Sequence, residues 1–413
     1  MTPRVYVTGM GVVSSLGLGR AAFWESLLAG RSGVAPVVSF DATELDRTVA
    51  AEVRDFVAAD HCTARELRDA GRCSHMTLAA ARMAVADAKL APEALRTERA
   101  AVVFGTTMGD ADLLTTLDDA FTLRGRDAVP AALVGRYSPS AHQLHVARAF
   151  GCRGAVLSLP AACAAGNYAI AMAADLLRAG RADVAVCGSS EMLQELEFCG
   201  FMRLGALAPD RPRPFDLDRA GLILGEGSGV FVLETEAHAV RRGANVLAEV
   251  GGYGVACDGF HITRPLPDAG GIVRAMREAV ERSGLTPDAV DFVNAHGTAT
   301  KANDAAESLA MAKVFGGRRV PISSIKSMLG HTMGASSALE AVSCVETILT
   351  GVYPPTIHYE TPDPECDVDL VANAPRTGPA DVVLNNALAF GGYDAVLCLA
   401  KPGRLPPPAE VAP

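Results

Sequence analysis

One stretch of the sequence, residues 155–180, constrains the fold more than any other. Its first five residues are typical of a buried strand and run into Pro160, after which small residues recur as in a helix that packs closely on its neighbours. Cys163 falls in the first turn of this helix, where unpaired backbone N–H groups and the helix dipole favour a thiolate. We therefore expect Cys163 to be a nucleophile at a strand-to-helix junction.

The same stretch carries no charge between Arg153 and Asp175, so a membrane-spanning helix is the alternative. Pro160 and the pair Gly166-Asn167 interrupt the run, and much of the remainder is Ala, Gly and Ser rather than Leu or Ile. This composition favours a helix buried within protein over one that faces lipid. We expect no membrane segment.

The composition indicates a compact protein with a large core. Hydrophobic residues make up 49% of the 413 residues and charged residues 20%, while a net charge of -10 argues against nucleic acid as a partner. The ten cysteines are scattered with no Cys-x-x-Cys pair, which predicts reduced thiols and no zinc site. The opening residues 1–7 leave no room for a signal peptide, so we expect a cytoplasmic location.

Two glycine-rich segments and one histidine pair raise the question of a cofactor or metal. The turn at residues 9–14 is similar to a dinucleotide-binding loop, but Ser14 replaces its third glycine and the expected acidic residue is missing. The loop at residues 225–229 lacks the Gly-Lys-Ser/Thr of phosphate loops. His142 and His145 lie three apart without a carboxylate or cysteine at ligand spacing. We therefore expect neither a cofactor nor a bound metal.

The second half of the chain repeats the first. The strand-like run at residues 246–254 is similar to the opening run at 4–14, and the strand, loop and small-residue helix at 321–342 repeat the pattern of 155–180. Such a repeat predicts an α/β protein built from two similar halves that pack as one unit.

This repeat also predicts the domain organisation. An N-terminal half that carries the nucleophilic cysteine would span residues 1–242, and a C-terminal half that carries two histidines would span residues 243–402. The proline-rich end, residues 403–413, is expected to form a loose tail.

Two histidines in the second half stand in loops of glycine and small residues, where a core side chain is unexpected. His296 follows a buried strand and His331 precedes the repeated helix. Because equivalent strand ends of the two halves should face one another, we expect both imidazoles to meet Cys163. Lys326 would either favour a neutral His331 or anchor a carboxylate such as Glu307, and the sequence does not choose between these roles.

One thiolate and two imidazoles suit acyl transfer followed by carbon–carbon bond formation. The thiolate can attack a thioester and hold its acyl group. The imidazole N–H groups can then bind the carbonyl of a second thioester as negative charge develops on it.

Four ordered motifs make the chain resemble the β-ketoacyl-[acyl-carrier-protein] synthases of the elongating, Cys-His-His type. They are Ala161-Ala-Cys163-Ala-Ala-Gly, Ala295-His-Gly-Thr-Ala-Thr300 with Asn303-Asp-Ala-Ala-Glu307, Lys326-Ser-Met-Leu-Gly-His331-Thr-Met-Gly-Ala, and Phe390-Gly-Gly. The resemblance runs from about Arg4 to Ala400. Related initiating synthases carry Asn in place of the second histidine, and thiolases carry a second cysteine.

The resemblance implies a thiolase-like fold, with two duplicated halves in a five-layer αβαβα sandwich. It also implies decarboxylative condensation of an acyl group on Cys163 with malonyl-acyl carrier protein, in fatty-acid or polyketide biosynthesis. Acyl carrier protein would be the partner, and the chain would form a homodimer or a heterodimer with a related ketosynthase-like subunit. No cofactor is implied beyond the phosphopantetheine that carries the substrates.

Further roles follow from the resemblance alone. The backbone amides of Cys163 and Phe390 would form the oxyanion hole. Thr298 and Thr300 would contact pantetheine, and Phe390 would also gate the pocket. Met108 would line the acyl pocket near the dimer interface.

The chain departs from the family pattern at four places near these motifs. Ala161 stands where Thr is usual, Asn294 where Glu is common and Ala389 where Gly is usual, and Tyr393-Asp394 replaces a pair that ends in Asn. Loss of glycine at 389 would stiffen the gate. These departures leave the acyl substrates open and lead us to favour specialised polyketide metabolism.

Two other functions compete with condensation. A non-catalytic partner of the chain-length-factor type usually lacks the nucleophile, whereas Cys163 and both histidines are present here. A cysteine-dependent thioesterase or acyltransferase would use the same cysteine without releasing CO2.

Overall fold

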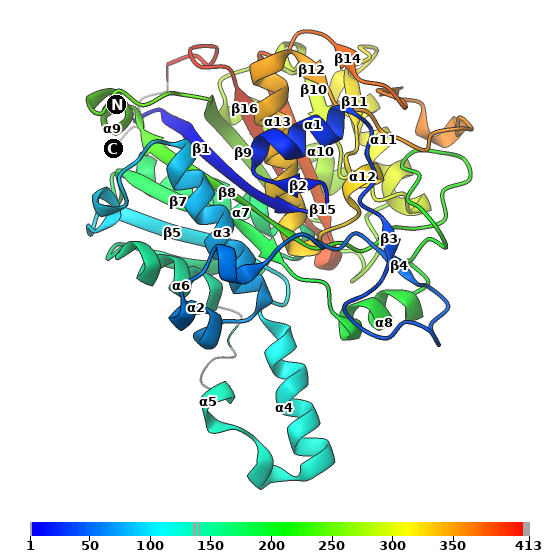
Figure 1. Ribbon diagram of the computed structural model, residues 1–413. Helices are drawn as coiled ribbons and strands as arrows, with labels where there is room; N and C mark the ends of the chain where they lie inside the picture. Colours follow the sequence, from blue (N-terminus) through cyan, green and yellow to red (C-terminus); the bar gives the residue numbers. More distant parts are fainter. Residues whose placement is uncertain (1, 135–137, 139–140, 408–413) are drawn as a thin grey trace.

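A 12-stranded sheet runs through the computed structural model, which describes residues 2–134, 138 and 141–407 (Figure 1). Its first half contains the strands β1 (Val5–Ser14), β5 (Ala100–Gly105), β6 (Val156–Leu159), β7 (Val184–Glu191) and β8 (Gly227–Thr235), with β2 (Gly17–Leu18) paired to β1. Its second half contains β9 (Ala248–Cys257), β10 (Phe292–Asn294), β11 (Pro321–Ser323), β13 (Asp369–Leu370), β15 (Val382–Ala389) and β16 (Tyr393–Ala400).

Strand pairing is the same in the two halves. In the first half β1–β8 and β8–β7 pair antiparallel, and β7–β5 and β5–β6 pair parallel. In the second half β9–β16 and β16–β15 pair antiparallel, and β15–β10 and β10–β11 pair parallel. The halves join where β1 meets β9, over the pairs Tyr6 with Glu249 and Val7 with Ala248. The predicted repeat is therefore present as one topology used twice.

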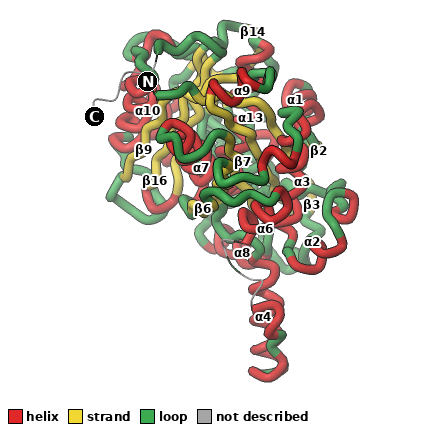
Figure 2. The backbone as a smooth tube through the Cα atoms, turned by 90° about the vertical axis from the view of Figure 1, so that its left-hand side faces the viewer, coloured by secondary structure: helices red, strands yellow, loops and turns green. Residues whose placement is uncertain are grey.

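Helices complete five layers around the two halves of the sheet. The helices that make the outer and middle layers are α3 (Arg72–Asp87), α6 (Ala141–Phe150), α7 (Ala165–Arg178), α10 (Gly270–Arg282), α11 (Lys301–Phe315) and α13 (Ser336–Thr350). On the outside, α3 covers β1 and β8 beside α6, while α10 covers β9 and β16 beside α11. Between the sheet halves, α7 and α13 contact each other (Figure 2). The predicted αβαβα order is confirmed.

The uncharged stretch between Arg153 and Asp175, for which a membrane-spanning helix was the alternative, lies at the centre of this sandwich. Residues 156–178 form β6, the 3-10 turn η4 (Ala162–Ala164) and α7. Small residues are needed because α7 crosses α13 closely: a Cβ on Gly166 would lie 2.4 Å from the backbone nitrogen of Ala338. Across the described ranges, no helix combines the length and hydrophobicity that crossing a bilayer requires.

An arm projects from the body between β5 and α6 (Figure 1). It contains α4 (Ala111–Arg124) and α5 (Ala131–Val134), which pack on each other, and it exposes Phe121 and Leu123. Gly125, with a φ of 86°, ends α4, and Pro130 directly precedes α5.

The start of the predicted tail packs against the body. Leu405 is buried, and its carbonyl oxygen accepts a hydrogen bond from the Arg4 guanidinium. Residues 408–413 lie outside the described part of the chain. The predicted division between residues 242 and 243 falls between α9 (Glu236–Arg241) and β9, and it stays a prediction.

Candidate active site

Cys163 lies in a strained turn between β6 and α7. The preceding residue, Ala162, has a φ of 47°, a left-handed conformation that costs energy for any residue with a Cβ. Met333 has a φ of 46° in the equivalent turn η6 (Met333–Ala335), so the duplicated halves share this elbow. The residue that matches Cys163 in the repeat is therefore Gly334, and His331 lies three residues before it.

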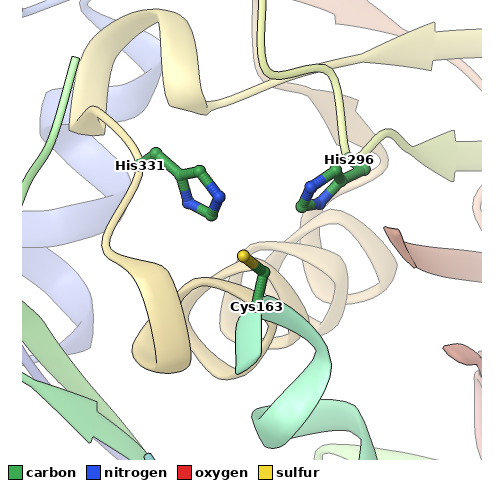
Figure 3. Close-up of side chains that lie close together, drawn as sticks. All are labelled: Cys163, His296 and His331. Carbon is green, nitrogen blue, oxygen red and sulfur yellow. The ribbon is translucent and has the colours of Figure 1, made fainter. Parts of the chain in front are cut away.

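Both histidines reach Cys163 from the second half (Figure 3). His296 follows β10, and His331 lies between α12 (Lys326–Leu329) and η6. The Cys163 sulfur and one nitrogen of each ring all lie within 4.8 Å of one another. The two rings meet edge to face, with 5.4 Å between their centroids. The structure thus brings together the three side chains that the sequence selected.

Lys326 connects this trio to a buried acid. Its ammonium group forms an ion pair with Glu340 of α13 and lies 3.3 Å from Nδ1 of His296. Lys326 therefore anchors a carboxylate, as one of the two alternatives expected, but the carboxylate belongs to Glu340 and not to Glu307. The Glu307 carboxylate has other partners. It accepts hydrogen bonds of 2.8 and 2.9 Å from the backbone N–H groups of His296 and Gly297. Glu307 therefore holds the histidine loop in place.

The Lys326 contact also sets the tautomer of His296. An ammonium group can only donate, so Nδ1 accepts and the ring proton is carried by Nε2. Burial lowers the pKa of His296 and of His331 well below the usual value, and Lys326 lowers both further. Both rings are therefore neutral at neutral pH. A neutral imidazole carries one N–H group, which it can donate to a substrate carbonyl.

Burial opposes the thiolate that the helix end favours. Burial raises the pKa of the Cys163 thiol to about 12, although the Lys326 charge acts in the opposite direction. Cys163 is 4% exposed, so desolvation outweighs its position at a helix end. The free enzyme therefore holds a neutral thiol.

A cavity of about 330 Å³ contains the trio. Thr298, Thr300 and Phe390 line it, as the resemblance implied, and the two threonine hydroxyls are 3.0 Å apart. Phe390 stacks on Phe201 with ring centroids 5.5 Å apart. Met108 is not part of the described lining; its N–H donates to Glu191 in the turn after β5.

The structure accommodates three of the four residues that depart from the family pattern without difficulty. Ala161 is buried before the elbow, and the Asn294 amide donates to the Asn385 side chain at 2.9 Å. Ala389 has a φ of -114°, an ordinary extended conformation, so the chain needs no glycine there.

Asp394 is the departure with an electrostatic consequence. It lines the cavity beside Asp258. Burial and the neighbouring Asp258 carboxylate raise the pKa of Asp394 to about 8. The side chain is therefore a neutral acid at pH 7, where the family pattern has a neutral amide.

Sequence reasoning missed Glu340 and Ser336, which fix Lys326 and His331. Ser336 lies 2.8 Å from Nδ1 of His331. A signal for Glu340 was present, because it is an acid flanked by the small and apolar residues of the segment 333–345. Among the described residues, the Cys163–His296–His331 trio is also the group whose donor atoms are close enough to share a metal ion.

Comparisons with known proteins agree with this geometry. Residues 2–239 match the family described as "Beta-ketoacyl synthase, N-terminal domain", and residues 247–360 match "Beta-ketoacyl synthase, C-terminal domain". The 3-oxoacyl-[acyl-carrier-protein] synthase 2 of Synechocystis sp. is 36% identical over 407 residues, which cover 96% of this chain and 98% of that protein.

Two solved structures share the whole fold. "The ishigamide ketosynthase/chain length factor" superposes with a TM-score of 0.94 at 40% identity, covering 98% of this chain and 100% of the matched chain. A type II polyketide synthase acyl-carrier protein in complex with its ketosynthase bound to the hexaketide gives a TM-score of 0.89 at 30% identity, covering 97% and 100%. With both family domains matched in order around the Cys-His-His site, this chain belongs to the β-ketoacyl synthase family.

Proposed function

We propose that this chain condenses an acyl group held on Cys163 with malonyl-acyl carrier protein and releases CO2 and β-ketoacyl-acyl carrier protein. The observation that carries the proposal is the trio itself. One sulfur and two ring nitrogens lie within 4.8 Å in a single cavity.

In the loading step, Cys163 takes the acyl group from carrier-protein phosphopantetheine. The bond from Sγ to the acyl carbon forms, the bond to the pantetheine sulfur breaks, and the thiol proton passes to the departing sulfur. The Lys326 charge stabilises the anion that develops on Sγ. The backbone N–H groups of Cys163 and Phe390 are proposed to hold the oxyanion.

In the condensation step, malonyl-acyl carrier protein replaces the first carrier protein. The bond to the carboxylate breaks, CO2 leaves, and its electron pair becomes an enolate whose oxygen accepts N–H donors from His296 and His331. The enolate carbon then attacks the acyl carbonyl, and Cys163 leaves as a thiolate that takes up one proton. The acyl groups arrive activated as thioesters, so the reaction requires no further cofactor.

The remaining predicted residues are proposed to serve substrate entry. Thr298 and Thr300 offer hydroxyl groups to pantetheine at the cavity wall, and Phe390 acts as a gate held on Phe201. Met108 is proposed to line the acyl end of the pocket; it lies in the turn after β5, outside the lining of the cavity around Cys163.

Acyl carrier protein is the proposed partner, with a second ketosynthase-like subunit in a homodimer or heterodimer. Related solved structures contain a carrier protein in one case and a chain length factor in the other. We also propose a cytoplasmic location, because all ten cysteines are free thiols, as in a reducing compartment.

A product assay tests the proposal. Incubation with acyl-acyl carrier protein and malonyl-acyl carrier protein should release CO2 and β-ketoacyl product in equal amounts, and Cys163→Ala should abolish the β-ketoacyl product. Acyl hydrolysis or transfer without CO2 would instead indicate a thioesterase or acyltransferase. Activity that is unchanged in Cys163→Ala would show that Cys163 is not the nucleophile and would overturn the proposal.

A further inference from the structure

Two acidic side chains meet beside the gate turn η8 (Phe390–Gly392). Asp394 lies two residues after this turn and is 2% exposed, and Asp258 lies in the loop that follows β9. Both line the cavity that contains Cys163, and their carboxyl groups are within hydrogen-bonding reach of each other. Two carboxyl groups can bond directly only if one of them carries a proton.

The other contacts of Asp258 leave one of its oxygens for this bond. Its Oδ2 accepts a 2.8 Å hydrogen bond from the backbone N–H of Leu266. Its Oδ1 lies with Oδ2 of Asp394 over Gly271, where an added Cβ would overlap both oxygens. Gly271 is in the first turn of α10, whose dipole favours one negative charge at this place. The Asp394 O–H therefore donates to Oδ1 of a charged Asp258.

Backbone hydrogen bonds join the loop that carries Asp258 to the gate turn. The Asp258 N–H donates to the Gly392 carbonyl oxygen at 3.0 Å, and the Gly391 N–H donates to the Ile262 carbonyl oxygen at 2.8 Å. The Cys257 thiol lies 3.9 Å from the Gly391 carbonyl oxygen, to which it donates. The acid pair adds a side-chain bond to this contact between the loop and the gate turn.

The groups around the acid pair suit one negative charge on it but not two. Burial and Asp258 raise the pKa of Asp394 to about 8. Glu307 of α11 acts in the same direction, and Arg274 of α10 acts against it, although its guanidinium also donates to a backbone carbonyl of β9. Tyr168 of α7 lies near Asp394, and burial together with that acid raises the pKa of its phenol, which is therefore uncharged. Loss of the Asp394 proton would thus leave two carboxylates facing each other.

We propose that Asp258 and Asp394 are positioning residues that share one proton and hold the gate turn against the loop 258–266. While the proton is present, the pair is bonded and the gate turn stays in place. When the proton leaves to solvent hydroxide, the two carboxylates repel each other and the contact opens. The effect on substrate entry rests on the proposed function, because that function makes Phe390 the gate.

This pH dependence follows from a residue in which the chain departs from the family pattern. The amide that is usual at position 394 donates an N–H to a carboxylate at every pH in the working range. A carboxyl group at the same position donates only while it is protonated. The acid pair therefore makes the gate contact sensitive to pH near 8.

Amide hydrogen exchange measures the contact without any substrate. The reporters are the N–H groups of Asp258 and Gly391, which bond across the contact. Exposure times are shortened in proportion to hydroxide concentration, so that intrinsic exchange is the same at each pH. Between pH 6.5 and pH 9.5, protection of these amides in the wild type should fall about 10- to 100-fold, the loss expected for one hydrogen bond to a charged group.

Two conservative variants keep the bond without a proton that can be lost. In Asp394→Asn the new amide donates to Asp258, and in Asp258→Asn it donates to Asp394, so both variants should keep their protection at pH 9.5. Asp394→Leu cannot form the bond and should show low protection at both pH values. Asp367→Asn, at an exposed carboxylate, is the matched control and should lose protection as the wild type does.

Two exchange results would overturn the proposal. One is wild-type protection that is the same at pH 6.5 and pH 9.5. The other is an equal loss of protection in the wild type and in Asp394→Asn, since the Asp394 proton would then have no part in it. Asp258→Asn gives the same comparison at a second position if Asp394→Asn does not fold.

Acyl loading then connects the acid pair to the gate. The loading rate of the wild type is divided by that of Asp394→Asn at each pH, which cancels the ionisation of Cys163. This quotient should rise about 3- to 10-fold from pH 6.5 to pH 9.5, the effect of one net hydrogen bond on gate opening. A quotient that does not change with pH would overturn the role of the pair in gating. If neither protein loads at any pH, the proposed function fails, while the exchange result still decides whether the pair holds the turn.

Discussion

Lys326 ties the reactive side chains together at the scale of single residues. It is buried, it pairs with Glu340, and its charge lowers the pKa of Cys163 and of both histidines. One cation therefore supports two requirements: neutral imidazoles that donate N–H groups, and a thiol that can lose its proton as the acyl group arrives.

Replacing His331 by alanine separates the two steps of the reaction. The variant lacks one N–H donor to the enolate, so condensation should fall about 100- to 1,000-fold, the usual cost of one oxyanion donor. Acyl loading should stay within about tenfold, because it does not form the enolate. Rapid-quench measurement of both steps provides the comparison. Equal losses in loading and condensation would contradict the enolate role.

Asp394→Asn should stabilise the protein at alkaline pH. The folded protein keeps the Asp394 proton up to about pH 8, whereas the unfolded chain loses it near pH 4. The unfolded state therefore binds fewer protons, and this group lowers wild-type stability as pH rises from about 4 to 8. The neutral amide removes that dependence.

Urea unfolding at pH 5 and pH 8.5 measures the effect. The stability gain of Asp394→Asn over wild type should increase by about 1–3 kcal/mol between the two pH values. Asp367→Asn, at an exposed carboxylate, is the matched control and should show no such increase. A gain that is the same at both pH values would mean that Asp394 does not retain its proton.

Much of the site was predictable from the sequence at this scale because its residues stand in motifs. Cys163, His296 and His331 each occur where a core side chain would be unusual. The protonation state of Cys163 was not predictable, because it depends on burial by segments distant in the chain. The partner of Lys326 likewise required the distance between α12 and α13.

At the scale of elements, the contact between α7 and α13 fixes where Cys163 lies. Gly166 in the first turn of α7 faces the backbone of Ala338, with no space for a Cβ. Gly166→Ala should therefore destabilise the protein by about 1–3 kcal/mol, because the two helices must separate. The rate of acyl loading on Cys163 should decrease as well.

Urea unfolding measures this change against a matched glycine. Gly200 lies in α8 (Glu195–Arg203), where a Cβ would meet nothing within 4 Å, so Gly200→Ala should be neutral or stabilising by up to about 1 kcal/mol. Equal effects of the two substitutions would show that helix propensity, and not the α7–α13 contact, decides stability.

The elements themselves were predicted with different success. Strands and helices with a strong pattern of apolar or small residues, such as β6 and α7, could be predicted from the sequence. The left-handed φ of Ala162 and Met333 was not, because alanine and methionine carry no signal for that conformation. The helix α4 escaped prediction because only Ala111, Leu113 and Ala120 of its side chains are buried, which leaves a weak apolar pattern in the sequence.

At the scale of the whole molecule, duplication creates the active site. The two halves use one strand pairing scheme, and their equivalent turns η4 and η6 both approach the centre. Each half alone carries only part of the chemistry: the nucleophile comes from the first and both imidazoles from the second (Figure 3). The sequence repeat predicted this arrangement, and the comparisons with ketosynthases support it independently.

The most direct test of the account is to locate the acyl group after a single loading step. The enzyme is incubated with acyl-acyl carrier protein alone, and the protein is analysed by intact mass and peptide mapping. The account predicts one acyl group per chain, on Cys163, which is discharged on addition of malonyl-acyl carrier protein with release of CO2. An acyl group on any other residue, or one that malonyl-acyl carrier protein does not discharge, would contradict it.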